Sequence, residues 1–134
     1  MPLEVNIYPR QRLIWVTGHD LVTDDDLLDY VKTYLVEADM RTFDEVFDLQ
    51  AADLLDVTFE GLSKVAATAA PTDPEESPTK IGILVSETMG VGISRMYQTL
   101  RSNKGGKRNL RIFWERLELL EWLERSHDDV GPPT

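Results

Sequence analysis

Two carboxylates near the middle of the chain, Asp48 and Asp56, stand where an acid–base pair could form. Asp48 closes an apolar segment, and Asp56 comes eight residues later, just before an expected helix. Two carboxylates can share general acid and general base work when both reach one substrate. Turn and helix-cap hydrogen bonds use the same residue type at such positions. His19 would be the third member of a catalytic site, and an enzyme built on these residues remains the rival of a binding role.

A glycine-containing segment, Gly90-Val91-Gly92-Ile93-Ser94-Arg95, opens the helix expected after a buried strand. It supplies two of the three glycines of a dinucleotide fingerprint, but Arg95 stands where the third would let helix and strand pack closely. The segment therefore favours a helix start with small residues over a nucleotide site. Ser94 also lies outside the G-x-S-x-G elbow of hydrolases.

The composition offers little to metal or thiol chemistry. The chain has no cysteine and two histidines, His19 and His127, so thiolate sites and histidine-based metal sites lack ligands. The three aspartates at 24–26 follow Thr23, which is typical of a capped helix start whose dipole attracts carboxylates. We therefore expect no metal and no cofactor.

Charge is distributed unevenly along the sequence. Fourteen basic side chains stand against 24 acidic ones, and the net charge of −10 argues against binding of nucleic acid or anionic lipid. The segment 88–114 nevertheless has no acidic residue and six basic ones, namely Arg95, Arg101, Lys104, Lys107, Arg108 and Arg111. A solvated basic loop, an anionic ligand near Arg95, and an acidic partner surface such as a second copy of the chain all remain open.

Hydrophobic periodicity predicts the elements that must position these residues. Strands are expected over 3–8, 13–16, 43–49, 81–85 and 110–114. Helices are expected from Thr23 to near Ala38, from Asp56 or Thr58 to Ala70, and over 88–100 and 116–124. Polar and glycine-rich composition predicts that the second strand ends at 18–20, with loops at 71–79 and 102–108.

The order β-β-α-β-α-β-α-β-α predicts one α/β domain over residues 1–126, with a single open sheet of about five strands. Helical connections make the sheet mostly parallel, and the short first connection adds one antiparallel hairpin strand. Residues 127–134 are expected to be a disordered tail. Without a long apolar run or a signal-peptide pattern at the N-terminus, the chain is expected to be cytoplasmic and to have no membrane span. Ligands of open α/β sheets bind at the carboxyl ends of the strands, where Asp48, Asp56 and Gly90 fall.

Three stretches together carry a family resemblance: the segment 90–100 (GVGISRMYQTL), a short strand ending in Phe113, and the segment 119–123 (LLEWL). They resemble the SpoIIAA-like bacterial proteins, which belong with the STAS domains and are often labelled STAS/SEC14-like. The resemblance spans residues 3 to 125. It implies an open α/β sheet and, for most members, no established activity.

The two branches of this resemblance imply different sites. In phosphorylation-switched antagonists, a strand ends in Asp and Asp-Ser-Ser-Gly follows eight residues later. Asp48 and Asp56 keep that spacing, but Val57 and Phe59 replace the phosphorylated serine and the glycine, and Thr58 is a hydroxyl one place late. The SEC14-like branch implies an apolar ligand held between helices and sheet, with Arg95 available for a head group and with Met89, Ile93, Met96 and Tyr97 along the helix.

We therefore expect a non-enzymatic regulatory domain that binds a protein partner, including a homodimer partner, or a small anionic or lipid-like ligand. The residues expected at its working surface are Asp48, Asp56, Thr58, Gly90, Arg95 and Tyr97. Two alternatives stay open: a carrier of a small apolar or anionic ligand, and an enzyme that uses the rim carboxylates.

Overall fold

A computed structural model describes residues 3–35, 37, 40–73, 79–86, 88–126 and 130 of the chain. Its centre is a five-stranded sheet in the order β1-β2-β4-β6-β7. The strands are β1 (Leu3–Tyr8), β2 (Leu13–Gly18), β4 (Asp44–Asp48), β6 (Lys80–Leu84) and β7 (Asn109–Phe113). β1 and β2 form an antiparallel hairpin, and the remaining neighbours pair in parallel. This mixed, mostly parallel sheet confirms the predicted fold class.

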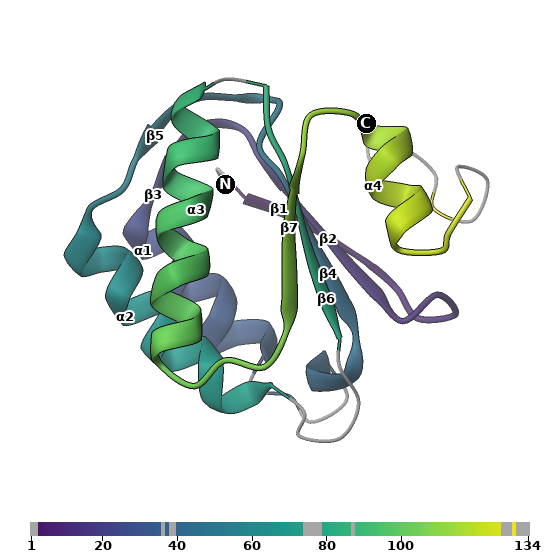
Figure 1. Cartoon of the computed structure of the whole chain (residues 1–134), viewed down its shortest axis with the longest axis horizontal. Helices are drawn as coiled ribbons and strands as arrows, with labels where there is room; N and C mark the ends of the chain where they lie inside the picture. Colours follow the sequence, from purple (N-terminus) through teal and green to yellow (C-terminus); the bar gives the residue numbers. More distant parts are fainter. Residues whose placement is uncertain are drawn as a thin grey trace.

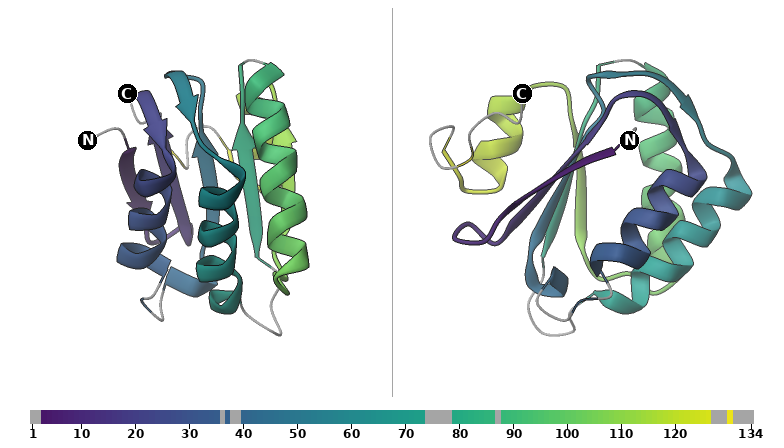
Figure 2. Two further views of the ribbon diagram at one scale, coloured as in Figure 1. Left: turned by 90° about the vertical axis from the view of Figure 1, so that its left-hand side faces the viewer. Right: turned by 180° about the vertical axis from the view of Figure 1, so that it is seen from behind.

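Helices cover the two faces of the sheet unequally. One face carries α1 (Asp24–Tyr30), α2 (Phe59–Ala69) and α3 (Thr88–Asn103), and the other carries α4 (Arg116–Trp122) (Figure 1). The turned views show the same two layers around the sheet (Figure 2). In the described part of the chain, no helix is long and apolar enough to cross a membrane.

Strict alternation along the strands decides which side chain meets which layer. Leu13, Trp15, Val46, Leu84 and Phe113 point toward α4 and pack against its buried residues Leu119, Leu120 and Leu123. The helix comes so close that a Cβ on Gly82 would lie 3.0 Å from Leu119 Cδ1. Intervening positions such as Ile14, Val16 and Ile83 face the three-helix layer.

β2 ends at Gly18, as expected, but a second, two-stranded parallel sheet follows it and corrects the expectation of a single sheet. β3 (Asp20–Thr23) pairs with β5 (Ala52–Asp56). Along the chain, β3 directly precedes α1, and β5 precedes α2. Asp20 has a φ of 55° and redirects the chain, in a left-handed conformation that aspartate tolerates better than most residues. Leu21 and Leu54 face outward from these strands, 43% and 51% exposed.

Several helix boundaries also differ from the prediction. Thr23 caps α1 in a reciprocal capping box with Asp26, as the sequence predicts, but the α-helix ends at Tyr30 and a π-helix continues over Val31–Leu35. A 3₁₀ turn, Ala70–Thr72, occupies the start of the predicted loop at 71–79. The predicted tail, 127–134, lies outside the described residues except for Val130, which is fully buried beside α4.

Candidate functional site

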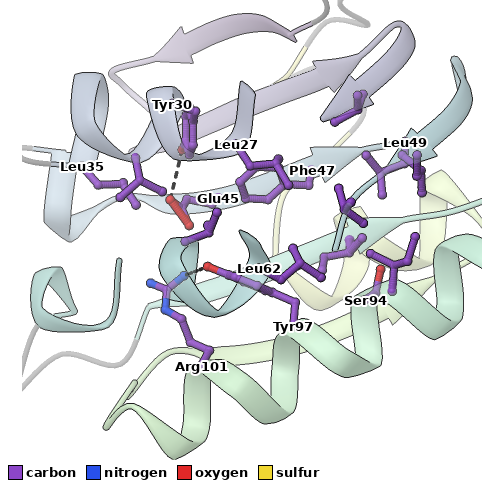
Figure 3. Close-up of a pocket in the computed structure, with 17 residues that line it drawn as sticks. Leu27, Tyr30, Leu35, Glu45, Phe47, Leu49, Leu62, Ser94, Tyr97 and Arg101 are labelled. Atoms are coloured by element: carbon purple, nitrogen blue, oxygen red, sulfur yellow. Dashed lines mark hydrogen bonds between the residues drawn. The ribbon is translucent and has the colours of Figure 1, made fainter. Parts of the chain in front are cut away.

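The three-helix face of the sheet encloses a cavity of about 60 Å³ (Figure 3). Its floor comes from the sheet through Phe47 and Ile83, and its walls come from the surrounding helices through Leu27, Leu62 and Val65. These side chains are apolar because both layers bury their inward faces here. The cavity is therefore better suited to an apolar group than to a polar one.

One side of the cavity is closed by the small β3–β5 sheet and the carboxyl end of β4. Val22 from β3, Leu55 from β5, Leu49 after β4 and Val57 before α2 all line it. This is the rim at which open α/β sheets hold their ligands. The two short strands that cover this rim were not expected from the sequence.

A buried carboxylate, Glu45 of β4, lines the cavity at the side where Tyr30 and Arg101 also lie. Glu45 is completely buried, and its Oε1 accepts a hydrogen bond of 3.0 Å from the Tyr30 hydroxyl. Burial, and next the negative charge of Glu45, raise the pKa of Tyr30 well above its usual value. The tyrosine is therefore held as a neutral donor to the carboxylate.

Two arginines and an aspartate complete what we call the buried ion cluster, consisting of Glu45, Asp73, Arg101 and Arg108. Asp73 Oδ1 lies 2.6 Å from Arg101 Nη2 and 2.9 Å from Arg108 Nε. Arg108 Nη1 lies 3.7 Å from Glu45 Oε2 and donates instead to the backbone carbonyl of Phe43 at 2.7 Å. Two acids and two arginines leave the cluster with no net charge.

Tyr97 of α3 joins this cluster to the cavity. Its hydroxyl accepts a 2.7 Å hydrogen bond from Arg101 Nη1, and its ring lines the cavity (Figure 3). Burial is the main cause that raises the pKa of Tyr97, partly offset by the charge of Arg101. Of the six residues expected at the working surface, Tyr97 lines the cavity.

Three buried polar atoms from residues that line this cavity have no hydrogen-bond partner among the described residues. They are Glu45 Oε2, Ser94 Oγ and Arg101 Nε. Ser94 is only 2% exposed, and Arg101 is 3% exposed. Buried polar atoms in native proteins are nearly always paired, and those that are not call for an explanation. All three atoms belong to residues that line this apolar cavity.

The two rim carboxylates do not form an acid–base pair. Asp48 Oδ1 accepts from the backbone amide of Gln50 at 3.0 Å, as in a turn, and Asp56 is exposed at the end of β5. His19 Nε2 lies 3.1 Å from Glu4 Oε1. The hydrogen bond from Asn6 has the largest effect in lowering the pKa of Glu4, and His19 with its hydrogen bond lowers that pKa further. These contacts give no support to the enzyme built on Asp48, Asp56 and His19.

Thr58 acts as the N-cap of α2. Its hydroxyl accepts from the amide of Gly61 at 2.9 Å and donates to Asp24 Oδ2 at 2.8 Å. Asp24 also accepts from the Thr58 amide, so it ties the start of α1 to the start of α2. A Cβ on Gly61 would lie 2.0 Å from Asp24 Cγ, which explains the glycine at this position. The geometry places Thr58 in a structural junction.

Gly90 and Arg95 lie apart from the cavity. Gly90 is buried against Val85, where a Cβ would lie 3.1 Å from Val85 Cγ1. Arg95 is exposed on α3 and makes no hydrogen bond or ion pair with the described residues. The predicted working surface is therefore divided between a helix packing contact, an exposed cation and Tyr97.

The predicted basic surface between Arg95 and Arg111 requires correction. Arg101 and Arg108 are buried in ion pairs with Asp73, and the Arg111 guanidinium lies 5.3 Å from the centre of the Phe113 ring. Arg95, Lys104, Lys107 and Arg111 are the basic residues of the segment that stay exposed. The run of basic residues is thus in part a set of internal counter-ions.

Sequence reasoning missed Glu45 as a functional candidate. The signal was present, since Glu45 and Phe47 are two residues apart and therefore share the inward face of a strand that lies between two others. An acidic residue is almost never fully buried unless it is paired. Asp73 had no comparable signal, because it follows a 3₁₀ turn in a stretch that reads as loop. Within the described ranges, no group of three or more acidic, histidine or cysteine residues could hold a metal ion.

Comparison with known proteins supports the fold alone. Neither a family model nor a curated protein matches the sequence. The structure is similar to the crystal structure of an uncharacterized protein of the DUF3478 family with a SpoIIAA-like fold from Shewanella loihica PV-4. The match has a TM-score of 0.55 and 12% sequence identity, and it covers 90% of this chain and 91% of the other. The chain therefore has a SpoIIAA-like fold, as the resemblance of its sequence implies.

Proposed function

We propose that this protein is a small-ligand-binding module whose site is the cavity between the sheet and its three-helix layer. The observation that carries the proposal is the presence of three unpaired polar atoms on residues lining one apolar cavity. An apolar pocket with a few convergent polar groups is the usual form of a small-molecule site. The role is binding, without a reaction, since the residues that could do acid–base work lie in turns, caps and an exposed strand end.

The size of the cavity limits what enters it without rearrangement. A volume of about 60 Å³ holds roughly two water molecules, or a group of a few non-hydrogen atoms. A larger ligand would place its remaining atoms toward the β3–β5 sheet, which covers the carboxyl end of the parallel strands. Outward movement of these two short strands would enlarge the site without disturbing the five-stranded sheet.

The first test is native mass spectrometry of the protein purified from its own host. We expect an added mass on the wild-type chain, identified after extraction into organic solvent. Ser94→Leu fills the cavity from α3 and should abolish the added mass. Ser102→Leu makes the same change at an exposed position of the same helix and should retain it.

Melting temperatures of the three proteins establish that all are folded. The same added mass on the Ser94→Leu protein would place the ligand elsewhere and contradict the proposal. A bare wild-type chain that also yields no extractable compound would contradict it as well. The native mass further reports subunit number, so it tests the expected association with a protein partner or a second copy, which stays a prediction.

A further inference from the structure

We propose that the ligand is an uncharged amphiphile that enters the cavity with a hydroxyl group foremost and donates a hydrogen bond to Glu45 Oε2. The inference rests on the proposed function and names the chemical class that the same site accepts. An alcohol or a phenol has this chemistry. A carboxylate, a phosphate or an ammonium group does not.

The hydrogen-bonding state of Glu45 selects a donor. Its Oε1 accepts from the Tyr30 hydroxyl, whereas its Oε2 accepts no hydrogen bond from the described residues although the side chain is completely buried. The Arg108 guanidinium stands 3.7 Å from Oε2, beyond hydrogen-bond distance, and is engaged with the Phe43 and Arg41 carbonyls. An ionised carboxylate only accepts, so the group that completes its coordination must donate.

The charge balance of the buried ion cluster selects a neutral donor. Glu45 and Asp73 carry two negative charges, and Arg101 and Arg108 carry two positive ones, all at 9% exposure or less. A charged group added beside them would remain uncompensated in a site from which water is largely excluded, and burial of an unpaired charge is very costly. A hydroxyl satisfies Glu45 Oε2 without changing that balance.

The remainder of the cavity selects an apolar body. Between Glu45 and the rim the walls are Phe47, Leu62 and Ile83, and Ser94 lies farther along α3. Ser94 and Arg101 are seven residues apart, so they are separated by about 10 Å along the helix. Figure 3 shows Ser94 and Leu49 on the opposite side of the site from Glu45 and Arg101. A hydroxyl at Glu45 therefore leaves the attached carbon atoms among apolar side chains.

The test uses four probes of similar length on the isotope-labelled full chain: hexanol, pentyl methyl ether, hexanoate and hexylammonium. Amide and methyl resonances in NMR titrations report both affinity and location. Hexanol and pentyl methyl ether are isomers that differ in the O–H donor, and we expect hexanol to bind about tenfold more tightly because its hydrogen bond is to a charged acceptor. Hexanoate and hexylammonium should bind more weakly than the ether.

Two variants locate the recognition on the protein. Glu45→Gln preserves the shape of the side chain and removes its charge, so the advantage of hexanol over the ether should fall to about threefold or less. Arg95→Gln removes an exposed cation from α3 and should leave all four affinities unchanged. The wild-type probe series decides the ligand class even where Glu45→Gln lowers the stability of the fold.

Each other outcome overturns the inference in a recognisable way. Equal affinities for hexanol and the ether would mean that water or another group satisfies Glu45 Oε2. Tightest binding by hexanoate, weakened in Arg95→Gln, would assign an anionic head group to Arg95 while leaving the proposed function intact. Failure of all four probes to shift resonances at the cavity would overturn the inference, while the native mass of the host-purified protein separately decides the proposed function.

Discussion

The two faces of the five-stranded sheet are made by the same alternating strands and yet differ in kind. Toward α4 the inward residues are apolar and pack closely, with Leu119 in contact distance of the strand backbone at Gly82. Toward the three-helix layer a glutamate, an aspartate and two arginines are buried, and two of the four, Glu45 and Arg101, line a cavity. Well-packed apolar residues of similar volume would often stabilise such a position as well or better. The comparison separates a closely packed face from the face that contains the candidate site.

Unpaired polar atoms are not confined to the site, so the contrast rests on where they lie. Trp15 Nε1 faces α4 without a hydrogen-bond partner among the described residues, but the Arg116 guanidinium stacks on its ring at 4.3 Å. This is a cation–π contact at a packed surface. The atoms on the opposite face belong to residues that line a cavity.

The largest expected effect comes from breaking the buried ion cluster. Asp73→Asn removes the charge that faces Arg101 and Arg108, and we expect it to lower the free energy of unfolding by about 3–5 kcal/mol. The reason is that two guanidinium groups would remain buried with a single carboxylate, Glu45. Chemical denaturation followed by tryptophan fluorescence measures the change.

Asp56→Asn is the matched control for that variant. Asp56 is exposed at the end of β5, so the same substitution there should change stability by less than about 0.5 kcal/mol. Similar losses in the two variants would show that the cluster contributes no more to the fold than a surface carboxylate. The distinction between the two faces would then rest on the cavity alone.

A second comparison removes one leucine from each face. Leu119→Ala on the α4 face should cost about 4 kcal/mol, and Leu62→Ala beside the cavity about 2–3 kcal/mol, within the range for buried leucines. Both side chains are at most 1% exposed. Leu62 already borders empty space, so its truncation loses fewer close contacts than that of Leu119. Equal costs in denaturation experiments would indicate that the three-helix layer is packed as tightly as the α4 layer.

Much of the fold follows from the sequence because periodicity determines it locally. The buried run at 81–85 corresponds to β6 (Lys80–Leu84), and the capped start at Thr23 and the antiparallel first hairpin agree with the structure. β3 and β5 escaped prediction because these four- and five-residue strands have adjacent apolar residues on opposite faces, and so show no apolar–polar alternation. A π-helical end to the first helix likewise has no local signature in the residues 31–35.

The candidate site follows from the sequence only in part, since its chemistry depends on contacts between distant segments. Tyr97 could be predicted from helical spacing toward the core. The pairing of Asp73 with Arg101 and Arg108 joins residues 28 and 35 positions apart, and no local pattern encodes it. The same pairing turns two residues of an expected surface patch into internal counter-ions.

The smallest expected effect, and the most specific to the site face, concerns the Tyr30 hydroxyl. Tyr30→Phe leaves the Glu45 carboxylate without its hydrogen-bond donor and should cost about 1–3 kcal/mol near neutral pH. Tyr34→Phe removes a hydroxyl from the neighbouring ring, which stacks on Tyr30 at 5.5 Å, and should cost less than about 0.5 kcal/mol. Denaturation curves at pH 7 measure both values.

The cost of Tyr30→Phe should depend on pH in one direction. Because burial and the charge of Glu45 raise the pKa of Tyr30 in the folded protein, the unfolded chain releases its phenolic proton first as the pH rises above 10. Stability then falls with pH, by up to about 1.4 kcal/mol per pH unit for one proton. The phenylalanine variant has no such proton, so the gap between wild type and variant should narrow above pH 10. Parallel curves from pH 7 to 11 would mean that Tyr30 ionises alike in both states, and that its contact with Glu45 does not distinguish the site face from the packed face.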